Sequence, residues 1–298
     1  MRRLTLAFGA ALAFAAPAAA HEGHRHAVGW TWSAEIVVPL VTLLIVYLIG
    51  LFRLRSRSRG GRAPLGSGAV RFAAGWAILA GALVSPLHEA GEVSFTAHMI
   101  EHELIMLPAA LLLVAARPGP VLLWGLPRQA RVPIAAVVRW PLWRALAGPV
   151  VATALQSAAL IAWHVPALFD RALQSDAWHI AQHLTFVATA LVFWWAMLGR
   201  GRGRAGHFVA ALCLFATSVI GGGLGALMAL DASPWYSGYA ALGMTPLGLS
   251  PVEDQQLAGV IMWIPGGLFH LAAALVFLGR ALAPERLDDS VSRRRQAA

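Results

Sequence analysis

Seven long apolar runs constrain the fold of this chain more than any other feature of its sequence. Each run is about as long as a helix must be to cross the hydrocarbon core of a bilayer, roughly 20 residues. None alternates apolar and polar residues with period two, as a membrane-spanning strand would. We therefore predict an all-α polytopic membrane helix bundle with about seven transmembrane helices. The runs are residues 34–52, 70–87, 95–116, 146–165, 178–198, 207–230 and 257–282.

Composition supports a membrane protein and excludes several other classes. With 58% hydrophobic residues, 12% charged residues and a mean hydropathy of +0.66, the 298-residue chain has too few polar side chains to cover a soluble domain. The net charge of +9 lies in short arginine clusters between the apolar runs, so we expect the lipid bilayer, and no nucleic acid, as a partner. Cys213 is the only cysteine, which excludes internal disulfides and thiolate zinc sites.

The N-terminus has the pattern of a cleavable secretory signal peptide over residues 1–20. Arg2 and Arg3 precede an Ala-rich apolar stretch, and small residues precede His21. An uncleaved anchor is the alternative, although the apolar stretch is short for a span. The predicted organisation is a signal peptide (1–20), a His-rich periplasmic segment (21–33), a seven-helix membrane domain (34–282) and a cytoplasmic Arg-rich tail (283–298).

Arginine placement predicts the orientation, since the chain contains no lysine. If the mature N-terminus is periplasmic, only Arg25 and Arg171 of the mature chain lie outside, as the positive-inside rule requires. We therefore expect a multi-pass protein of a bacterial inner membrane with a cytoplasmic C-terminus. The inner connection 117–149 mixes arginine with tryptophan and is either an interfacial segment or an ordinary loop.

Most histidines fall on the side predicted to be outer. Nine of the 11 histidines lie in or near the outer half, as do 11 of the 14 acidic residues. A protein surface that is rich in acidic and histidine side chains attracts cations. The nine are His21, His24, His26, His88, His98, His102, His164, His179 and His183.

Two of the apolar runs carry histidines at helical spacing. His98 and His102 are four residues apart and share one helix face, and Met106 continues that row; His179 and His183 repeat the spacing in the fifth run. Because both pairs enter from the same side, we expect the two helices to face each other. Ionisable groups at membrane depth are expensive, which favours a function for them.

These residue types favour copper. Imidazole with thioether suits Cu(I), and imidazole with carboxylate suits Cu(II). A single membrane histidine, such as His88, His207 or His270, more often makes an interhelical hydrogen bond, and a buried methionine is more often a packing residue. The N-terminal histidines either capture metal or belong to a flexible tail. The predicted metal ligands are His98, His102, His164, His179, His183, Met106, Asp254 and Gln255.

Several motifs resemble one known family. Ala97-His98-Met99 through His102, Trp163-His164-Val165-Pro166, Trp178-His179 through His183, and Asp254-Gln255-Gln256 through Met262-Trp263-Ile264-Pro265-Gly266 resemble, in this order, the CtaG family of seven-span proteins associated with assembly of caa-type cytochrome c oxidase. The resemblance covers about residues 30–282. It implies an assembly factor that works with oxidase subunits and helps copper reach the copper-B centre.

We therefore expect a non-enzymatic assembly factor that holds or delivers copper, with a periplasmic copper chaperone as a possible donor. The sequence contains neither the chain order of a Ser/His/Asp catalytic triad nor a metalloprotease helix motif, so it does not support a hydrolytic site. Three alternatives stay open: a bis-His haem-binding electron carrier, a copper permease and a scaffold without a ligand. A permease would need polar groups through the full membrane depth, yet the inner half offers mainly Gln156, His207 and His270.

Overall fold

The computed structural model describes residues 29–57, 62–199 and 203–283. All regular structure in these residues is helical, which confirms the all-α prediction. Six helical segments are long and apolar enough to cross a membrane, and a bent pair of helices makes up to seven. Three predicted segments lie wholly or largely outside the described residues: the signal peptide (1–20), the His-rich segment (21–33) and the Arg-rich tail (283–298).

The six spanning segments match six of the predicted apolar runs. Two of them contain a π-helical turn, η1 or η2, in mid-span. In chain order the segments are α1 (Ala34–Arg57), α2 (Arg62–Val84), α4 (Phe95–Leu104) with η1 (Ile105–Ala109) and α5 (Ala110–Ala115), α11 (Asp176–Met197), α12 (Arg204–Leu230), and α14 (Pro251–Ile261) with η2 (Met262–Gly266) and α15 (Gly267–Leu282).

The fourth predicted apolar run, 146–165, contains one helix, and a second helix follows it beyond the run after a bend. α9 (Pro149–Trp163) is followed by α10 (Pro166–Gln174), and the two are bent by 72°. Proline has no backbone N–H and disfavours a helical residue before it, so Pro166 ends α9 and starts a new helix. At 1.5 Å per residue, the 15 residues of α9 span about 22 Å. The run therefore crosses most of the bilayer and then turns across the end of the bundle.

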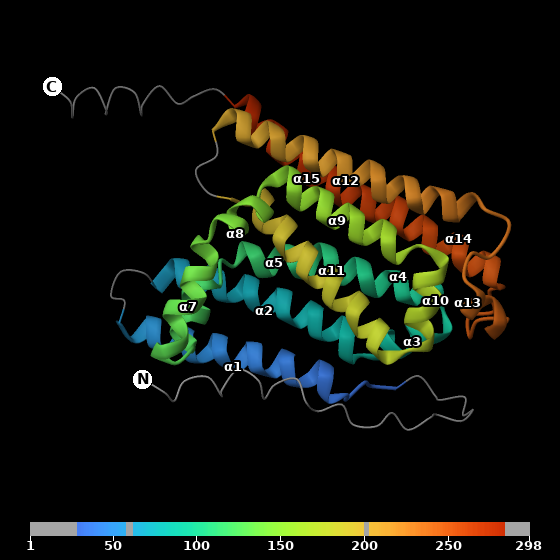
Figure 1. Cartoon of the computed structure of the whole chain (residues 1–298), viewed down its shortest axis with the longest axis horizontal. Helices are drawn as coiled ribbons and strands as arrows, with labels where there is room; N and C mark the ends of the chain where they lie inside the picture. The colour runs from blue at the N-terminus through green and yellow to red at the C-terminus, as the bar shows by residue number, and fades with distance from the viewer. Residues whose placement is uncertain (1–28, 58–61, 200–202, 284–298) are drawn as a thin grey trace.

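Short helices gather at the two ends of the bundle (Figure 1). α3 (Pro86–Val93), α10 and α13 (Ser237–Leu242) lie at one end, where the predicted outer loops meet. The connection 117–149 lies at the other end and folds into α6 (Gly119–Gly125), α7 (Arg128–Arg139) and α8 (Pro141–Leu146). The first end thus includes α3 with His88, and the second end includes the arginine-rich connection.

Packing inside the bundle depends on small residues where two spanning segments cross closely. α12 packs along α14 and α15. A Cβ atom added to Gly225 would lie 2.7 Å from the carbonyl oxygen of Gly259, so only glycine allows the two backbones to approach this closely. Large apolar side chains such as Phe52 of α1 and Phe215 of α12 are exposed on the outer faces, where lipid would cover them.

Candidate metal centre

The candidate site is built where α3, α4 and α11 meet at one end of the bundle (Figure 1). Ser85 begins α3, since its hydroxyl accepts a hydrogen bond from the backbone N–H of Leu87, and Pro86 occupies the first turn. Ser94 separates α3 from α4 and caps α4 in the same way through Ala97. These two caps place His88 on α3 opposite the first turns of α4.

The side chain of Asp254, on α14, caps the N-terminus of α4. Its carboxylate accepts hydrogen bonds from the backbone N–H groups of Phe95 at 2.6 Å and Thr96 at 3.2 Å, and from the Ser94 hydroxyl at 2.9 Å. A carboxylate at a helix N-terminus satisfies donors that have no partner within the helix. Asp254 therefore orients the helix that carries His98 and His102.

The two histidine pairs lie against each other. The ring centroids of His98 and His102 are 4.2 Å apart, and those of His179 and His183 are 4.5 Å apart. Between the helices, His98 lies 5.6 Å from His179, and His102 lies 5.0 Å from His183. The prediction that the two histidine-bearing helices face each other is confirmed.

The structure adds His88 and Glu101 to this group. Glu101 is fully buried, and its Oε1 atom accepts a hydrogen bond from His88 Nδ1 at 2.7 Å and lies 3.3 Å from His183 Nε2. One ligand atom from each of the three residues falls within 4.8 Å of the others, which is close enough to hold a metal ion after small rotamer changes. We refer to His88, His98, Glu101, His102, His179 and His183 as the imidazole cluster.

Sequence reasoning missed these two residues for different reasons. His88 stands alone in its part of the sequence, and nothing in the sequence shows that α3 folds back onto α4. Glu101 carries a usable signal: it follows His98 by three residues, so the two share a helix face.

Hydrogen bonds assign the ring nitrogens of His183. Its Nδ1 lies 3.1 Å from the carbonyl oxygen of His179, so Nδ1 carries the proton and Nε2 carries a lone pair. That lone pair faces Glu101 Oε1 at 3.3 Å, and two acceptors in contact repel each other. Either a second proton on His183 or a metal ion between the two atoms resolves the conflict. Metal-binding histidines typically hold their other ring nitrogen in this way.

Other buried ring nitrogens of the imidazole cluster also lack partners among the described residues. They are Nε2 of His98, both ring nitrogens of His102 and Nε2 of His179. Leaving a buried polar atom unsatisfied costs about 1–3 kcal/mol. Phe169 and Phe186 pack against His98 and His102, so the surroundings are apolar as well. The donor set therefore fits a metal ion.

His88 lies outside the spanning segments, at the outer edge of the cluster. Burial lowers the pKa of its imidazole, but the hydrogen bond and the charge of Glu101 outweigh burial and raise that pKa above its ordinary value. His88 therefore stabilises the ionised form of Glu101 when no other cation is present.

The remaining predicted ligands lie elsewhere. His164, at the end of α9, holds Nδ1 2.7 Å from the Leu160 carbonyl, and its ring packs on Phe169, while its buried Nε2 has no hydrogen-bond partner among the described residues. Asp254 caps α4, as described above. Gln255 accepts from the Trp235 backbone N–H at 2.6 Å, which supports the loop before α14.

Met106 lies in a separate cavity. It is the residue that continues the row of His98 and His102, and its sulfur accepts a hydrogen bond from Gln156 Nε2 at 3.5 Å. The structure thus places four of the eight predicted ligands in the imidazole cluster.

Comparisons with known proteins place the chain in a family. The model of the family described as cytochrome c oxidase caa3 assembly factor matches residues 45–283. Two similar proteins, both named as uncharacterised, come from Mycobacterium bovis and Mycobacterium tuberculosis; each is 26% identical over 280 residues. The match covers 89% of this chain but only 40% of each relative, so the chain spans less than half the length of these proteins. No solved structure matches. Since the family model covers most of the membrane bundle, the chain belongs to the cytochrome c oxidase caa3 assembly factor family.

Proposed function

We propose that this protein holds copper at the imidazole cluster and delivers it during assembly of a caa3-type oxidase. The observation that carries the proposal is the set of buried, unpartnered ring nitrogens around the buried carboxylate of Glu101. Family membership supports the assembly role, and the donor chemistry supports the cargo.

The donor set favours copper over hard cations. Ca²⁺ and Mg²⁺ take oxygen ligands, whereas the imidazole cluster offers five imidazoles and one carboxylate. Imidazole suits copper and zinc, and sites of this type bind Cu(II) more tightly than Zn(II). The experiment below therefore measures both metals.

The number of donors favours transient binding. A structural metal site is closed by about four ligands, while the imidazole cluster has more donors than one ion can use. Spare imidazoles beside a bound ion allow it to exchange one ligand for another in small steps. A protein that receives and releases copper needs such exchange.

The position of the cluster favours delivery from outside the membrane. α3 carries His88, and α11, which carries His183 near its start, follows α10 directly; α3, α10 and α13 lie at one end of the bundle (Figure 1). The arginine distribution predicts that this end is periplasmic. We propose that copper arrives from a periplasmic donor and leaves to an oxidase subunit in the same inner membrane.

Metal analysis of the full chain purified in detergent tests this function. We expect the wild-type protein to retain copper after dialysis, and His102→Ala and His183→Ala to lose at least ten-fold in copper affinity. His207→Ala is the matched control, since His207 lies near Phe277 at the opposite end of the bundle. Unchanged affinity in both cluster variants would overturn the site.

The same samples separate the alternative functions. Bound haem would give an intense Soret absorption band, and a preference for zinc over copper would contradict copper delivery. In cells, both cluster variants should insert normally, while the oxidase accumulates with haem but lacks copper at the copper-B centre. Loss of the oxidase subunits themselves, without response to added copper, would indicate a scaffold instead.

A further inference from the structure

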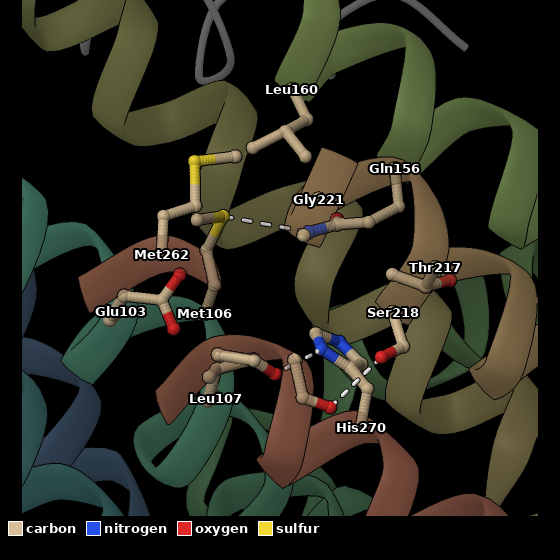
Figure 2. A pocket seen from close by; sticks show the side chains of 13 residues that line it. Glu103, Met106, Leu107, Gln156, Leu160, Thr217, Ser218, Gly221, Met262 and His270 are labelled. Carbon is tan, nitrogen blue, oxygen red and sulfur yellow. Dashed lines mark hydrogen bonds between the residues drawn. The ribbon is translucent and has the colours of Figure 1, made fainter. Parts of the chain in front are cut away.

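A second group of side chains with potential metal-donor atoms lines a small cavity between several helices (Figure 2). The cavity has a volume of about 30 Å³ and lies between α4 with η1, α9, α12 and η2 with α15. A cavity of this size has room for one ion or one or two water molecules, and none for an organic cofactor. The residues that matter for its chemistry are Glu103, Met106, Gln156, Met262 and His270.

Two π-helical turns place thioethers in this cavity. Met106 lies in η1 and Met262 begins η2, and each turn contains a proline, Pro108 or Pro265. Proline removes one hydrogen bond of the helix ladder, and a π-turn accommodates the interruption by widening the helix. Such turns are rare and occur frequently at functional sites. Figure 2 shows both methionine side chains at the cavity, from two different spans.

Unpartnered oxygen atoms lie in the same cavity. Glu103 Oε2 and Gln156 Oε1 are both shielded from the surface and have no hydrogen-bond partner among the described residues. None of the described residues that line the cavity is an arginine. An ionised carboxylate at this depth is costly unless a cation lies beside it. A bound monovalent cation would favour the ionised form of Glu103, whose single negative charge would balance the charge of the ion.

His270 adds a nitrogen donor held in a defined orientation. Its Nδ1 lies 3.0 Å from the Gly266 carbonyl, which leaves Nε2 with a lone pair. The ring stacks on Trp194 at a centroid separation of 6.0 Å and an interplanar angle of 6°. Trp194 is in turn held by a hydrogen bond of 2.9 Å from its ring N–H to the Met106 carbonyl.

We propose that this cavity is a second metal site, which binds Cu(I) through the sulfurs of Met106 and Met262 and the carboxylate of Glu103. Thioethers are soft ligands that select Cu(I) over harder cations, and one carboxylate neutralises its single charge. The site's place in a copper route rests on the function proposed above. His102 and Met106 are one helical turn apart on the same span, so the two sites would be neighbours along that route.

X-ray absorption spectroscopy of the full chain, loaded with Cu(I) in detergent, tests this site. We expect the wild-type spectrum to contain sulfur neighbours at about 2.3 Å, a typical metal–thiolate or thioether distance. Met106→Leu combined with Met262→Leu should remove the sulfur signal and one equivalent of bound Cu(I), since leucine has nearly the same volume and leaves the fold intact. The matched control is Met197→Leu, a fully buried methionine of α11 that does not line the cavity.

Glu103→Gln provides an independent variant that retains both sulfurs. It should keep the sulfur signal while lowering the Cu(I) affinity, measured against a chromophoric chelator, at least ten-fold. A wild-type spectrum without sulfur neighbours would overturn the second site, as would a sulfur signal that survives in the double methionine variant. An unchanged affinity in Glu103→Gln would overturn the role of the carboxylate.

The experiments distinguish failure of the second site from failure of the imidazole cluster. His102→Ala with His183→Ala should remove the copper bound at the imidazole cluster and leave the sulfur signal unchanged. If nitrogen-coordinated copper is present and sulfur is absent, the function proposed above stands without this site. If the sulfur signal is present and the histidine variants bind copper normally, the imidazole cluster is the part that fails.

Discussion

Replacing Asp254 tests how the imidazole cluster is held in place. Its carboxylate bonds to the Phe95 and Thr96 backbone N–H groups and to the Ser94 hydroxyl, and Asp254 is buried. A hydrogen bond to a charged group contributes about 1.5–3 kcal/mol. Loss of the two backbone bonds in Asp254→Ala should therefore lower the free energy of unfolding by roughly 3–6 kcal/mol. Asp254→Asn keeps one carbonyl acceptor and should lose about half as much.

Reversible unfolding in mixed detergent micelles, followed by tryptophan fluorescence, measures this change. Asp176→Asn is the control, because Asp176 is an exposed carboxylate in the first turn of α11, where such a residue contributes about 0.3–1 kcal/mol. Copper binding to the folded Asp254→Asn protein should be close to normal at saturating copper, since Asp254 orients α4 rather than binding the ion.

Two results would refute this reasoning. If Asp254→Asn unfolds with the wild-type free energy, the capping bonds contribute little to stability. If the variant is stable but no longer retains copper, Asp254 is a ligand, as the sequence alone suggested, and the structural role is wrong.

Two further predictions concern packing and topology. Gly225→Ala should destabilise the bundle by about 1–3 kcal/mol in the same unfolding assay, because its Cβ would lie 2.7 Å from the Gly259 carbonyl; Gly223→Ala, whose Cβ would meet nothing within 4 Å, should be neutral or slightly stabilising. Equal effects of the two substitutions would contradict the close crossing of α12 and α14. A periplasm-active reporter fused after Ala298 should be silent, and strong activity would overturn the seven-span topology.

The spans could be predicted from sequence because hydrocarbon imposes a strict requirement on the chain. Every backbone polar group in the bilayer core must be bonded within the segment, so an apolar run of about 20 residues has one stable form. The break at Pro166 was also visible in the sequence, as a proline soon after an apolar run, but the direction of α10 depends on contacts with α11 and α13.

Part of the site could be predicted because four-residue spacing puts two histidines on one helix face. The pairs His98/His102 and His179/His183 therefore emerged from local geometry alone. The sequence could not show whether Asp254 is a metal ligand or a helix-capping residue, since both roles need a carboxylate near the end of a span. That distinction depends on which backbone N–H groups lie nearby, and those belong to residues about 160 positions away.

By itself, the sequence determined the helical class, the segments long enough to span and the helices that carry the histidines, because each follows from local hydropathy or helical periodicity. Only the tertiary structure decided that α3 folds back so that His88 meets Glu101, and that Met106 leaves the histidine row for a cavity shared with Met262. The physical reason is that helix rotation and neighbour choice depend on side-chain packing between segments distant in sequence, such as the Gly225–Gly259 crossing.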